Sequence, residues 1–455
     1  RRGGDRAARP GRVGRGVSST MAARVTSVCG REVLDSRGRP TLEAELAWSS
    51  VDGNCGVVRA MVPSGKSTGE AEAKELRDGD KDRYAGEGCL QAAKNINTTL
   101  GAAVLGMDPC DQRAIDAKLL SLDSSPLKDK SQIGANAILA VSMACCRAGA
   151  QAKGVPLCKH INALASEALG GKEVNMVMPV PCLNVINGGV HAGNLLAFQE
   201  FFLIPSGAHT FAEAMRIGAE TYQVLKGVIK ETYGLRDTAV GDEGGFAPNI
   251  SSPEEGMRLL TKAIERAGHQ DKIFLGSDPA ASEFFDKATG KYDLGFKSTE
   301  RSTERSADKK SPSEMVAIYQ SICAGFPMVL LEDPFDEDDY ASHAELTASI
   351  GEGIEIVGDD LYCTNVQRVQ KGLDMAATNA MLLKPNQIGS VTESLDAWAL
   401  CRRNEWGVFV SHRSGETEDA FIADLVVGIG AGHIKSGAPC RSERLAKYNQ
   451  LLRIE

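Results

Sequence analysis

Val408–Thr417 reads VFVSHRSGET, and this stretch decides the fold. A short apolar run, 407–410, ends at the polar cluster Ser411-His412-Arg413-Ser414. This pattern predicts a buried strand whose end carries functional groups. The second half of the chain repeats the pattern, because each apolar run stops at an acid, a base or a metal-type ligand. A barrel of parallel strands with its active site at the strand ends gives this arrangement.

Strand-like runs follow one another through the second half of the chain, with helical stretches between most of them. The eight runs are Val180–Asn187, Glu200–Pro205, Thr238–Gly241, Lys272–Asp278, Met328–Glu332, Glu355–Asp359, Ala380–Lys384 and Val408–His412. Eight strands with helical crossovers predict an α/β fold with a C-terminal (β/α)₈-type barrel. The first two runs leave almost no room for a helix between them, so we expect them to form a hairpin.

A smaller unit precedes the barrel. Strand patterns at 25–33, 41–48 and 56–62 come first, and helical patterns follow at 70–77, 88–105, 109–121 and 133–153. Strands followed by helices predict an N-terminal α+β domain. We place this domain at residues 21–160 and the barrel domain at 161–455, because few periodic apolar positions surround the glycine pair at 170–171.

Length and composition narrow the class of protein. A chain of 455 residues is too long for one ordinary core. The net charge of −9 argues against a nucleic-acid or anionic-membrane partner. No apolar run approaches the ~18 residues of a membrane span. Twelve cysteines without a CxxC pair are typical of a reduced, cytoplasmic enzyme.

Residues 1–20 form a leader that cannot build a core. They hold six Arg, five Gly and a single acid, a composition that predicts disorder. An acid-poor segment with Arg and Ser fits an organelle transit peptide. The favoured alternative is translated upstream sequence ahead of a start at Met21, so we predict a cytoplasmic protein.

Three acids end successive predicted strands: Asp278, Glu332 and Asp359. Carboxylates that converge at the barrel mouth repel and raise one another's pKa. A divalent cation removes this cost, and ligands that are all oxygen suit Mg²⁺ rather than Zn²⁺. Three further acids, Asp242, Asp333 and Asp360, adjoin candidate site residues in the sequence. Spacing alone does not show which of these three contributes to the site.

Lys384 follows an apolar strand beside these acids. Burial and nearby positive charge are expected to lower its pKa, so that the neutral amine accepts a proton. Glu243 lies across the barrel between glycines, which suggests close approach of a ligand. Arg413 and its neighbours suit an anionic oxygen group. A metal cage, a base, an acid and an anion clamp suit proton abstraction beside a carboxylate, with loss of a leaving group.

The stretch Gly65-Lys66-Ser67-Thr68 resembles the end of a phosphate-binding P-loop. That motif needs a glycine five residues before Gly65, where this chain has Ala60. We therefore reject nucleotide hydrolysis. The loop remains suited to a mobile lid over a phosphate.

From about residue 25 to residue 455 the chain closely resembles the enolase family. The shared motifs are LDSRGRPT (34–41), PSGKSTG (63–69), ELRDGD (75–80), GANAILAVS (134–142), NGGVHAGN (187–194), GDEGGFAPN (241–249), LLEDPF (330–335), LLKPNQIG (382–389), SHRSGETED (411–419) and APCRSERLAKYNQLLRIE (438–455). The resemblance implies reversible, Mg²⁺-dependent dehydration of 2-phospho-D-glycerate to phosphoenolpyruvate in glycolysis and gluconeogenesis. It also implies a homodimer.

Matched motif to motif, the resemblance implies a role for each residue. Lys384 removes the proton at carbon 2, and Glu243, assisted by Glu200, protonates the departing 3-hydroxyl; His191 completes the catalytic set. One Mg²⁺ is implied at Asp278, Glu332 and Asp359, and a second arrives with substrate at Ser67. The implied substrate-binding residues are His191, Gln199, Glu200, His412, Arg413, Ser414, Lys435 and Ser67.

Two alternatives remain open from the sequence. One is a non-catalytic protein with the same fold, suggested by Lys66, which replaces the usual Ala of the lid loop, and by Pro279 after Asp278. The other is a related barrel that acts on a different carboxylate acid. Arg413 and Ser414, residue types that bind phosphate, argue against the second alternative.

Overall fold

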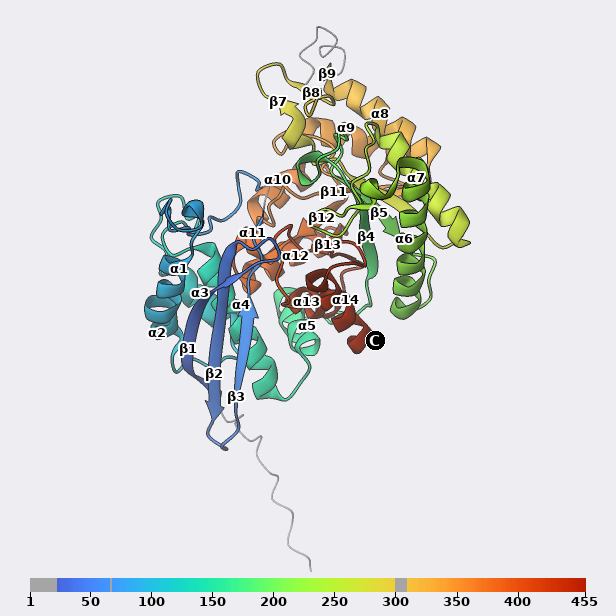
Figure 1. Ribbon diagram of the computed structural model, residues 1–455. Helices are drawn as coiled ribbons and strands as arrows, with labels where there is room; N and C mark the ends of the chain where they lie inside the picture. The colour runs from blue at the N-terminus through green and yellow to red at the C-terminus, as the bar shows by residue number, and fades with distance from the viewer. Residues whose placement is uncertain (1–22, 66–67, 299–308) are drawn as a thin grey trace, which may run out of the picture.

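The computed structural model describes residues 23–65, 68–298 and 309–455. The leader at 1–20, Lys66 and Ser67 therefore lie outside the described residues. An N-terminal part stands beside a barrel that the rest of the chain builds (Figure 1).

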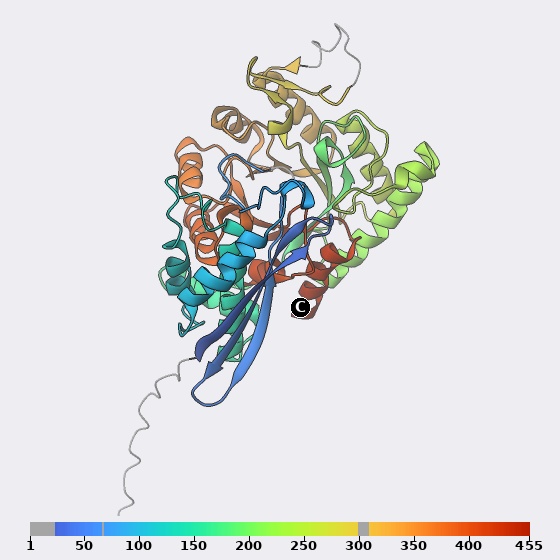
Figure 2. The same cartoon turned by 60° about the vertical axis from the view of Figure 1, so that its left-hand side comes forward.

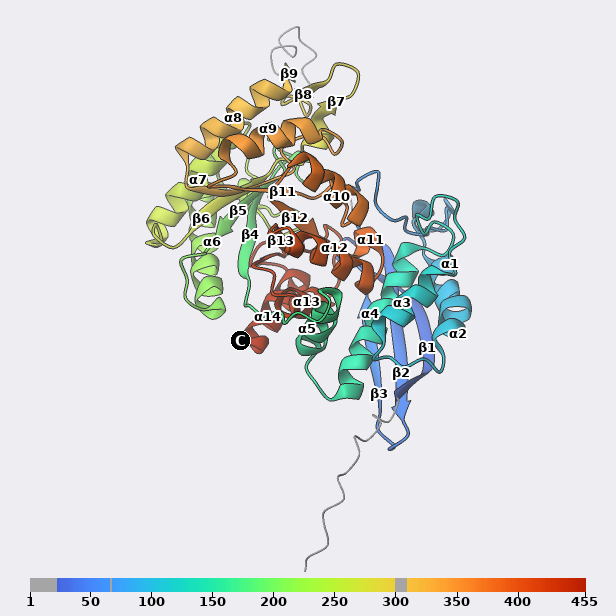
Figure 3. The same cartoon turned by 180° about the vertical axis from the view of Figure 1, so that it is seen from behind.

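The N-terminal part is an antiparallel sheet covered by helices. Its strands, in the order β1-β2-β3, are β1 (Ala23–Leu34), β2 (Pro40–Ser50) and β3 (Cys55–Met61). Alternate residues of β2 are fully buried because α4 (Ala135–Lys153) covers that face of the sheet (Figure 3). The other helices of this part are α1 (Leu90–Asn95), α2 (Gly101–Val104), α3 (Gln112–Leu120) and α5 (Leu157–Ala168), with a π turn, η2 (Ile96–Leu100), between α1 and α2. The sheet extends away from the barrel as a long twisted blade (Figure 2).

The helix predicted at 70–77 is wrong. This segment has no helical turn and runs along the barrel instead. The amide of Ala73 donates to the carbonyl of Gln387, and the carboxylate of Glu72 bonds Arg413. These contacts with the barrel replace the local hydrogen bonds that a helix would need.

The barrel is closed by eight strands, as predicted. They are β4 (Val180–Asn187), β5 (Glu200–Ile204), β6 (Phe274–Asp278), β10 (Met328–Glu332), β11 (Glu355–Gly358), β12 (Ala380–Leu383), β13 (Gly407–Ser411) and β14 (His433–Lys435). The hairpin prediction is confirmed, because β5 pairs antiparallel with both β4 and β6. All other neighbours in the barrel are parallel.

One predicted strand is wrong, and one real strand was missed. Thr238 ends a 3₁₀ turn, η4 (Leu235–Thr238), and Val240 forms only an isolated bridge with Phe246. The eighth barrel strand is β14, whose three residues are too few for a periodic pattern. The strand in the opening stretch, β13, is therefore seventh along the chain and pairs with β12 and β14.

Helices surround the barrel, and short polar residues cap several of them. For example, the Thr210 side chain accepts the amide of Glu213, which begins α6. The helices are α6 (Phe211–Tyr233), α7 (Pro253–Ala267), α8 (Pro312–Gly325), α9 (Tyr340–Ile350), α10 (Val366–Met375), α11 (Pro385–Ile388), α12 (Val391–Arg403), α13 (Phe421–Gly428) and α14 (Ser442–Ile454). A small sheet joins β7 (Phe285–Asp286), β8 (Lys291–Asp293) and β9 (Lys309–Lys310).

The interior of the barrel is a packed apolar layer. Its members, none more than 3% exposed, are Cys182, Phe202, Ile204, Leu330, Val357, Ala380, Leu382 and Phe409. This layer leaves polar chemistry to the two ends of the barrel. The twelve cysteines are all described and all free. Within the described ranges, no helix combines the length and apolar character that a bilayer crossing requires.

Candidate active site

The carboxyl ends of the strands meet around one buried polar pocket. It is lined by His191, Gln199, Glu200, Glu243, Asp278, Ala280, Asp333, Asp359, Asp360, Lys384, His412, Arg413, Ser414 and Lys435. The pocket therefore gathers every predicted site residue in the described chain except Glu332, which reaches it through Lys435. Its free volume is only about 30 Å³, because ion pairs fill it. A larger cavity of about 800 Å³ lies elsewhere, beside α5 and α14, and gathers none of these residues.

Lys435, at the end of β14, is the centre of the acidic side of the pocket. Its Nζ lies 2.7 Å from Oε1 of Glu332, 3.0 Å from Oδ2 of Asp278 and 3.1 Å from Oε2 of Glu200. Burial opposes the charge of the ammonium, but these carboxylates raise the pKa of Lys435 well above its usual value. One cation thus neutralises acids from three strands.

Lys384 follows β12 and bonds Oδ2 of Asp359. The other oxygen of Asp359 accepts a hydrogen bond of 2.8 Å from Nε2 of Gln387. Burial disfavours the ammonium of Lys384, but the Asp359 carboxylate outweighs it and raises the pKa of Lys384 above its usual value. The prediction of a lowered pKa is therefore wrong for this state, because the sequence does not reveal that Asp359 is in direct contact.

Two groups of described residues have ligand atoms that all lie within 4.8 Å of one another and could hold a metal ion. They are Asp333 with Asp359 and Asp360, and His191 with Glu200 and Glu243. Of the predicted metal trio, only Asp359 belongs to either group. Asp278 and Glu332 gather around Lys435 instead.

Asp333 organises the end of β11. Its two carboxylate oxygens accept the backbone amides of Asp359 and Asp360, each at 2.8 Å. Asp333 itself has a φ of 39°, an uncommon backbone conformation for a residue other than glycine. These contacts give Asp333 a structural role at the pocket, which its position in the sequence alone did not reveal.

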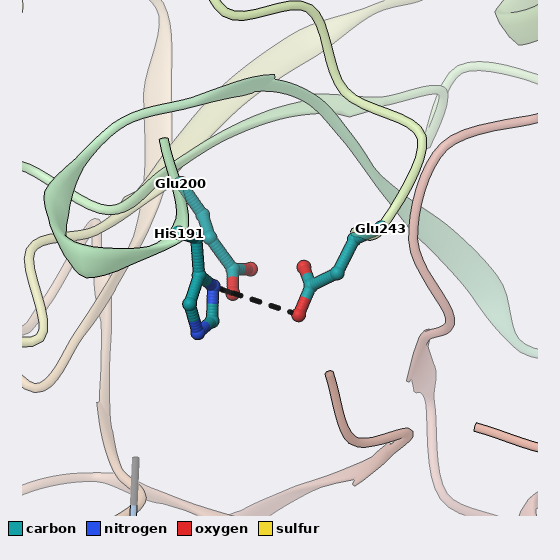
Figure 4. Close-up of side chains that lie close together, drawn as sticks. All are labelled: His191, Glu200 and Glu243. Atoms are coloured by element: carbon teal, nitrogen blue, oxygen red, sulfur yellow. Dashed lines mark ion pairs between the residues drawn. The ribbon is translucent and has the colours of Figure 1, made fainter. Parts of the chain in front are cut away.

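His191, Glu200 and Glu243 point toward one another across the pocket (Figure 4). Nδ1 of His191 lies 3.7 Å from Oε1 of Glu243 and 4.0 Å from Oε1 of Glu200. Nδ2 of Asn184 donates to Oε2 of Glu243 at 2.8 Å, which orients that carboxyl group. β4 supplies Asn184 and β5 supplies Glu200, so the predicted hairpin builds this side of the site.

The two glutamates titrate in opposite directions. Burial, together with the charge of Glu243, raises the pKa of Glu200 well above its usual value. Burial also opposes ionisation of Glu243, but a positive charge on the neighbouring His412 or His191, together with the cations Arg444 and Lys435, would lower its pKa. The two carboxyls, which lie together around His191, therefore differ in their tendency to hold a proton.

Arg413, just after β13, already holds an anion from its own chain. Its Nη1 lies 2.9 Å from Oε2 of Glu72, and its Nη2 lies 3.1 Å from Oε1 of the same residue. Both side chains are at least nine-tenths buried. The amide of Gly69 also donates to Glu72, at 3.1 Å. Glu72, in the segment after the lid, therefore takes the place on Arg413 that was predicted for an external anion.

The sequence analysis missed several residues that organise the site. Glu72 and Gln387 lie close to predicted site residues along the chain, so a search for buried polar neighbours would have found them. Arg444 has no such signal, because it lies within a helix, α14, and not at a strand end. It is nevertheless fully buried and contacts two of the site loops.

Comparison with known proteins gives consistent matches along the chain. A family model described as the enolase C-terminal TIM barrel domain matches residues 175–455, and one described as the enolase N-terminal domain matches residues 25–161. The chain is 52% identical over 431 residues to "Enolase B" of Dictyostelium discoideum, covering 95% of this chain and 94% of that protein. It is 53% identical over 435 residues to "Enolase" of Eimeria tenella, covering 95% of each.

Proposed function

The chain belongs to the enolase family and is a hydro-lyase that dehydrates 2-phospho-D-glycerate to phosphoenolpyruvate in glycolysis, and we propose how its own residues divide that reaction. The observation that carries the proposal is the placement of Lys384 and Glu243 in one buried pocket, on elements from different parts of the barrel. Lys384 removes the proton at carbon 2. Glu243 delivers a proton to the departing 3-hydroxyl from another side of the substrate.

The proton for the leaving group belongs to the Glu200–Glu243 pair rather than to Glu243 alone. Glu200 is the residue whose pKa is raised, and its carboxyl lies beside that of Glu243 around His191. Glu243 protonates the hydroxyl, and Glu200, whose carboxyl lies beside it around His191, assists. His191 lines the same space and orients the two carboxyls.

The donor set at the strand ends fits a hard divalent cation, because it consists of carboxylate oxygens. Asp278, Glu332 and Asp359 would hold the first Mg²⁺, and Ser67 a second that enters with substrate. Bound Mg²⁺ supplies positive charge that stabilises the dianion formed on loss of the carbon-2 proton. Lys435 supports this fit, since its ammonium already neutralises Asp278 and Glu332.

Arg413 and Ser414 bind the substrate phosphate. Since Arg413 bonds Glu72 in this state and the pocket has little free volume, the segment carrying Glu72 must shift before substrate enters. The remaining substrate contacts are assigned to His191, Gln199, Glu200, His412, Lys435 and Ser67. Lys66 stands beside Ser67 and adds a positive charge to the same lid.

The test measures the formation of phosphoenolpyruvate from 2-phospho-D-glycerate through the absorbance of the product. The assay is run once with Mg²⁺ and once with a chelator. We expect product only with Mg²⁺. Failure to form product under both conditions would favour the non-catalytic alternative. The same assay is repeated with carboxylic acids that carry no phosphate group. Faster turnover of one of these acids would favour the alternative of a related barrel enzyme with a different substrate.

We further propose a homodimer, a cytoplasmic location and a division between domains 21–160 and 161–455. Family membership supports the dimer, and free cysteines are compatible with a reduced compartment. Light scattering of the purified protein measures the assembly. N-terminal sequencing of the natural protein decides whether residues 1–20 are present in it.

A further inference from the structure

Arg444 joins two loops of the active site from a helix outside it. The residue lies in α14 and is fully buried. Its Nη1 lies 2.6 Å from Nδ1 of His412 and 2.5 Å from the carbonyl oxygen of Arg413. Its Nη2 donates to the carbonyls of Ser414 at 2.7 Å and Asp242 at 3.1 Å. A single guanidinium therefore contacts the chain on both sides of the pocket.

The contact with His412 decides the tautomer of that ring. A guanidinium donates hydrogen bonds and cannot accept them, so Nδ1 of His412 must be the acceptor. A neutral imidazole whose Nδ1 accepts carries its hydrogen on Nε2. This Nε2 lies 3.7 Å from Oε2 of Glu243. His412 thus presents an N–H donor toward the proposed acid.

We propose that Arg444 is a positioning residue that holds His412 as the neutral Nε2–H donor and fixes the Glu243 loop against the Arg413 loop. The effect of Arg444 on catalysis rests on the function proposed above, but its effect on the His412 tautomer does not. In this assignment the Nε2–H of His412 lies 3.7 Å from Oε2 of Glu243 and is available to donate to the leaving oxygen. His412 does not serve as a base.

The groups that face His412 favour the neutral ring. Burial is the largest influence and lowers the pKa of His412 well below its usual value. The charge of Glu243 acts in the opposite direction, whereas Arg444, Lys435 and Lys384 reinforce burial. Burial and these cations act in the same direction as the Arg444 contact, which requires an unprotonated Nδ1.

The surrounding backbone is shaped to admit the Arg444 side chain. Gly437 has a φ of 78°, a conformation that favours glycine. A Cβ there would lie 2.7 Å from the carbonyl oxygen of Glu243 and 3.0 Å from Cδ of Arg444. The next amide, that of Ala438, donates to the same carbonyl of Glu243 at 3.0 Å. The Glu243 backbone is thus held directly by Ala438 and indirectly, through Asp242, by Arg444.

The test measures the tautomer by nitrogen NMR of the intact protein with labelled histidine. The chain has seven histidines, and the signal lost in His412→Asn identifies His412. We expect a bare Nδ1 and a protonated Nε2 from about pH 5 to about pH 8, the interval in which an unperturbed ring changes charge. A protonated Nδ1, or a doubly protonated ring at neutral pH, overturns the proposal without any variant of Arg444.

Variants of Arg444 test the cause. Arg444→Met removes both the charge and the several N–H donors of the guanidinium. If this variant does not fold, Arg444→Lys is used instead, because it keeps the charge but has a single donor nitrogen. We expect mixed tautomers, a ring that titrates, and kcat/KM lower by about 10- to 100-fold, as for other residues that orient an active-site group. Arg453→Met is the matched control, because Arg453 is exposed on the same helix and bonds Gln450.

Two outcomes separate this proposal from the proposed function. An unchanged His412 spectrum in a folded Arg444 variant overturns the role of Arg444, whatever the activity. Conversely, a wild-type protein with the expected tautomer but no dehydratase activity leaves the positioning role intact and contradicts the proposed function.

Discussion

The two ends of the barrel both hold ionisable groups, but those at the carboxyl end are buried in close ion pairs, whereas Glu355 and His433 at the other end are partly exposed and 3.8 Å apart. Strand β11 has Glu355 at its start and Asp359 just beyond its end. Asp359 bonds both Lys384 and Gln387. Among the residues that the structure describes, the ion-pair partner of Glu355 is the ring of His433, with Oε2 3.8 Å from Nδ1. Burial raises the pKa of Glu355 to about 7 and lowers that of His433 to about 4.

The difference shows how the fold keeps charge where it is used. A buried group without a partner becomes neutral, since desolvation disfavours its charged form. At the carboxyl end of the barrel, burial opposes ionisation of Asp359, but Lys384 outweighs it and lowers the pKa of Asp359. Burial and neighbouring carboxylates still raise the pKa of Glu200 and Glu332, although Lys435 contacts both. The packed apolar layer separates the two ends, so substitutions at one end should leave the other unchanged.

The largest expected effect is on catalysis at the paired end. In Lys384→Ala we expect kcat to fall by about 10²- to 10⁴-fold, because the proposed base is removed. The measurement is phosphoenolpyruvate formation at saturating Mg²⁺ and substrate. Glu355→Gln, at the other end of the barrel, is the control and should keep the wild-type kcat. Full activity in Lys384→Ala would remove the base assignment.

Lys435 tests the paired end through stability. In Lys435→Met the buried carboxylates of Asp278, Glu332 and Glu200 lose their cation, so the metal-free protein should lose about 3–5 kcal/mol of unfolding free energy. Mg²⁺ should restore part of this loss, which urea unfolding with and without the metal measures. Lys287→Met is the control and should cost at most about 1 kcal/mol, because its pair with Glu70 is exposed. Equal losses in the two variants would argue against a shared cation.

Glu72 tests whether the protein's own carboxylate competes with phosphate. Glu72→Gln should bind inorganic phosphate about tenfold more tightly, because Arg413 no longer has to leave a charged hydrogen bond worth about 1.5 kcal/mol. Calorimetric titration of the metal-loaded protein measures this affinity. Glu70→Gln, an exposed neighbour in the same segment, should leave it unchanged. Weaker binding in Glu72→Gln would mean that Glu72 chiefly orients Arg413.

The smallest effect belongs to the unpaired end. The folded pKa of Glu355, about 7, lies above the ordinary glutamate value, so the folded state binds the extra proton. Its stabilising contribution is complete below about pH 4.5 and is lost as the pH rises through 7. Because the side chain is 37% exposed, we expect Glu355→Gln to stabilise the fold by only about 1 kcal/mol at pH 8 and little at pH 5. A thermal scan at both pH values that shows the same difference would contradict the raised pKa.

Short-range patterns predicted most of the barrel and failed where the pattern was too short. Seven of the eight predicted runs coincide with barrel strands, since an apolar run that ends at a polar residue is a local signal. The 433–435 strand offers three residues, and its pairing with β13 and β4 comes from closure of the barrel. The false strand at 238–241 has a suitable composition, but its strand-type pairing in the described structure is limited to the isolated bridge between Val240 and Phe246.

The site residues were accessible to sequence reasoning because strand ends of a barrel meet at one edge. The pairing of several of them was not, since the partner comes from a distant segment. Glu72 reaches Arg413 from the N-terminal part, and Arg444 reaches His412 from α14. No spacing rule connects residues that are brought together only by the packing of separate elements.

The sequence by itself determined the barrel class, the hairpin at its start, and several of the charged residues that line the pocket, among them Lys384, Glu243 and Arg413. Periodicity and strand-end position are properties of a short stretch, and they survive without knowledge of the rest. Only the tertiary structure decided which charges neutralise one another. The pKa of Lys384 rises rather than falls because Asp359 lies against it. Electrostatic energies depend on distances of a few ångströms and on burial, and both are fixed only when distant segments pack together.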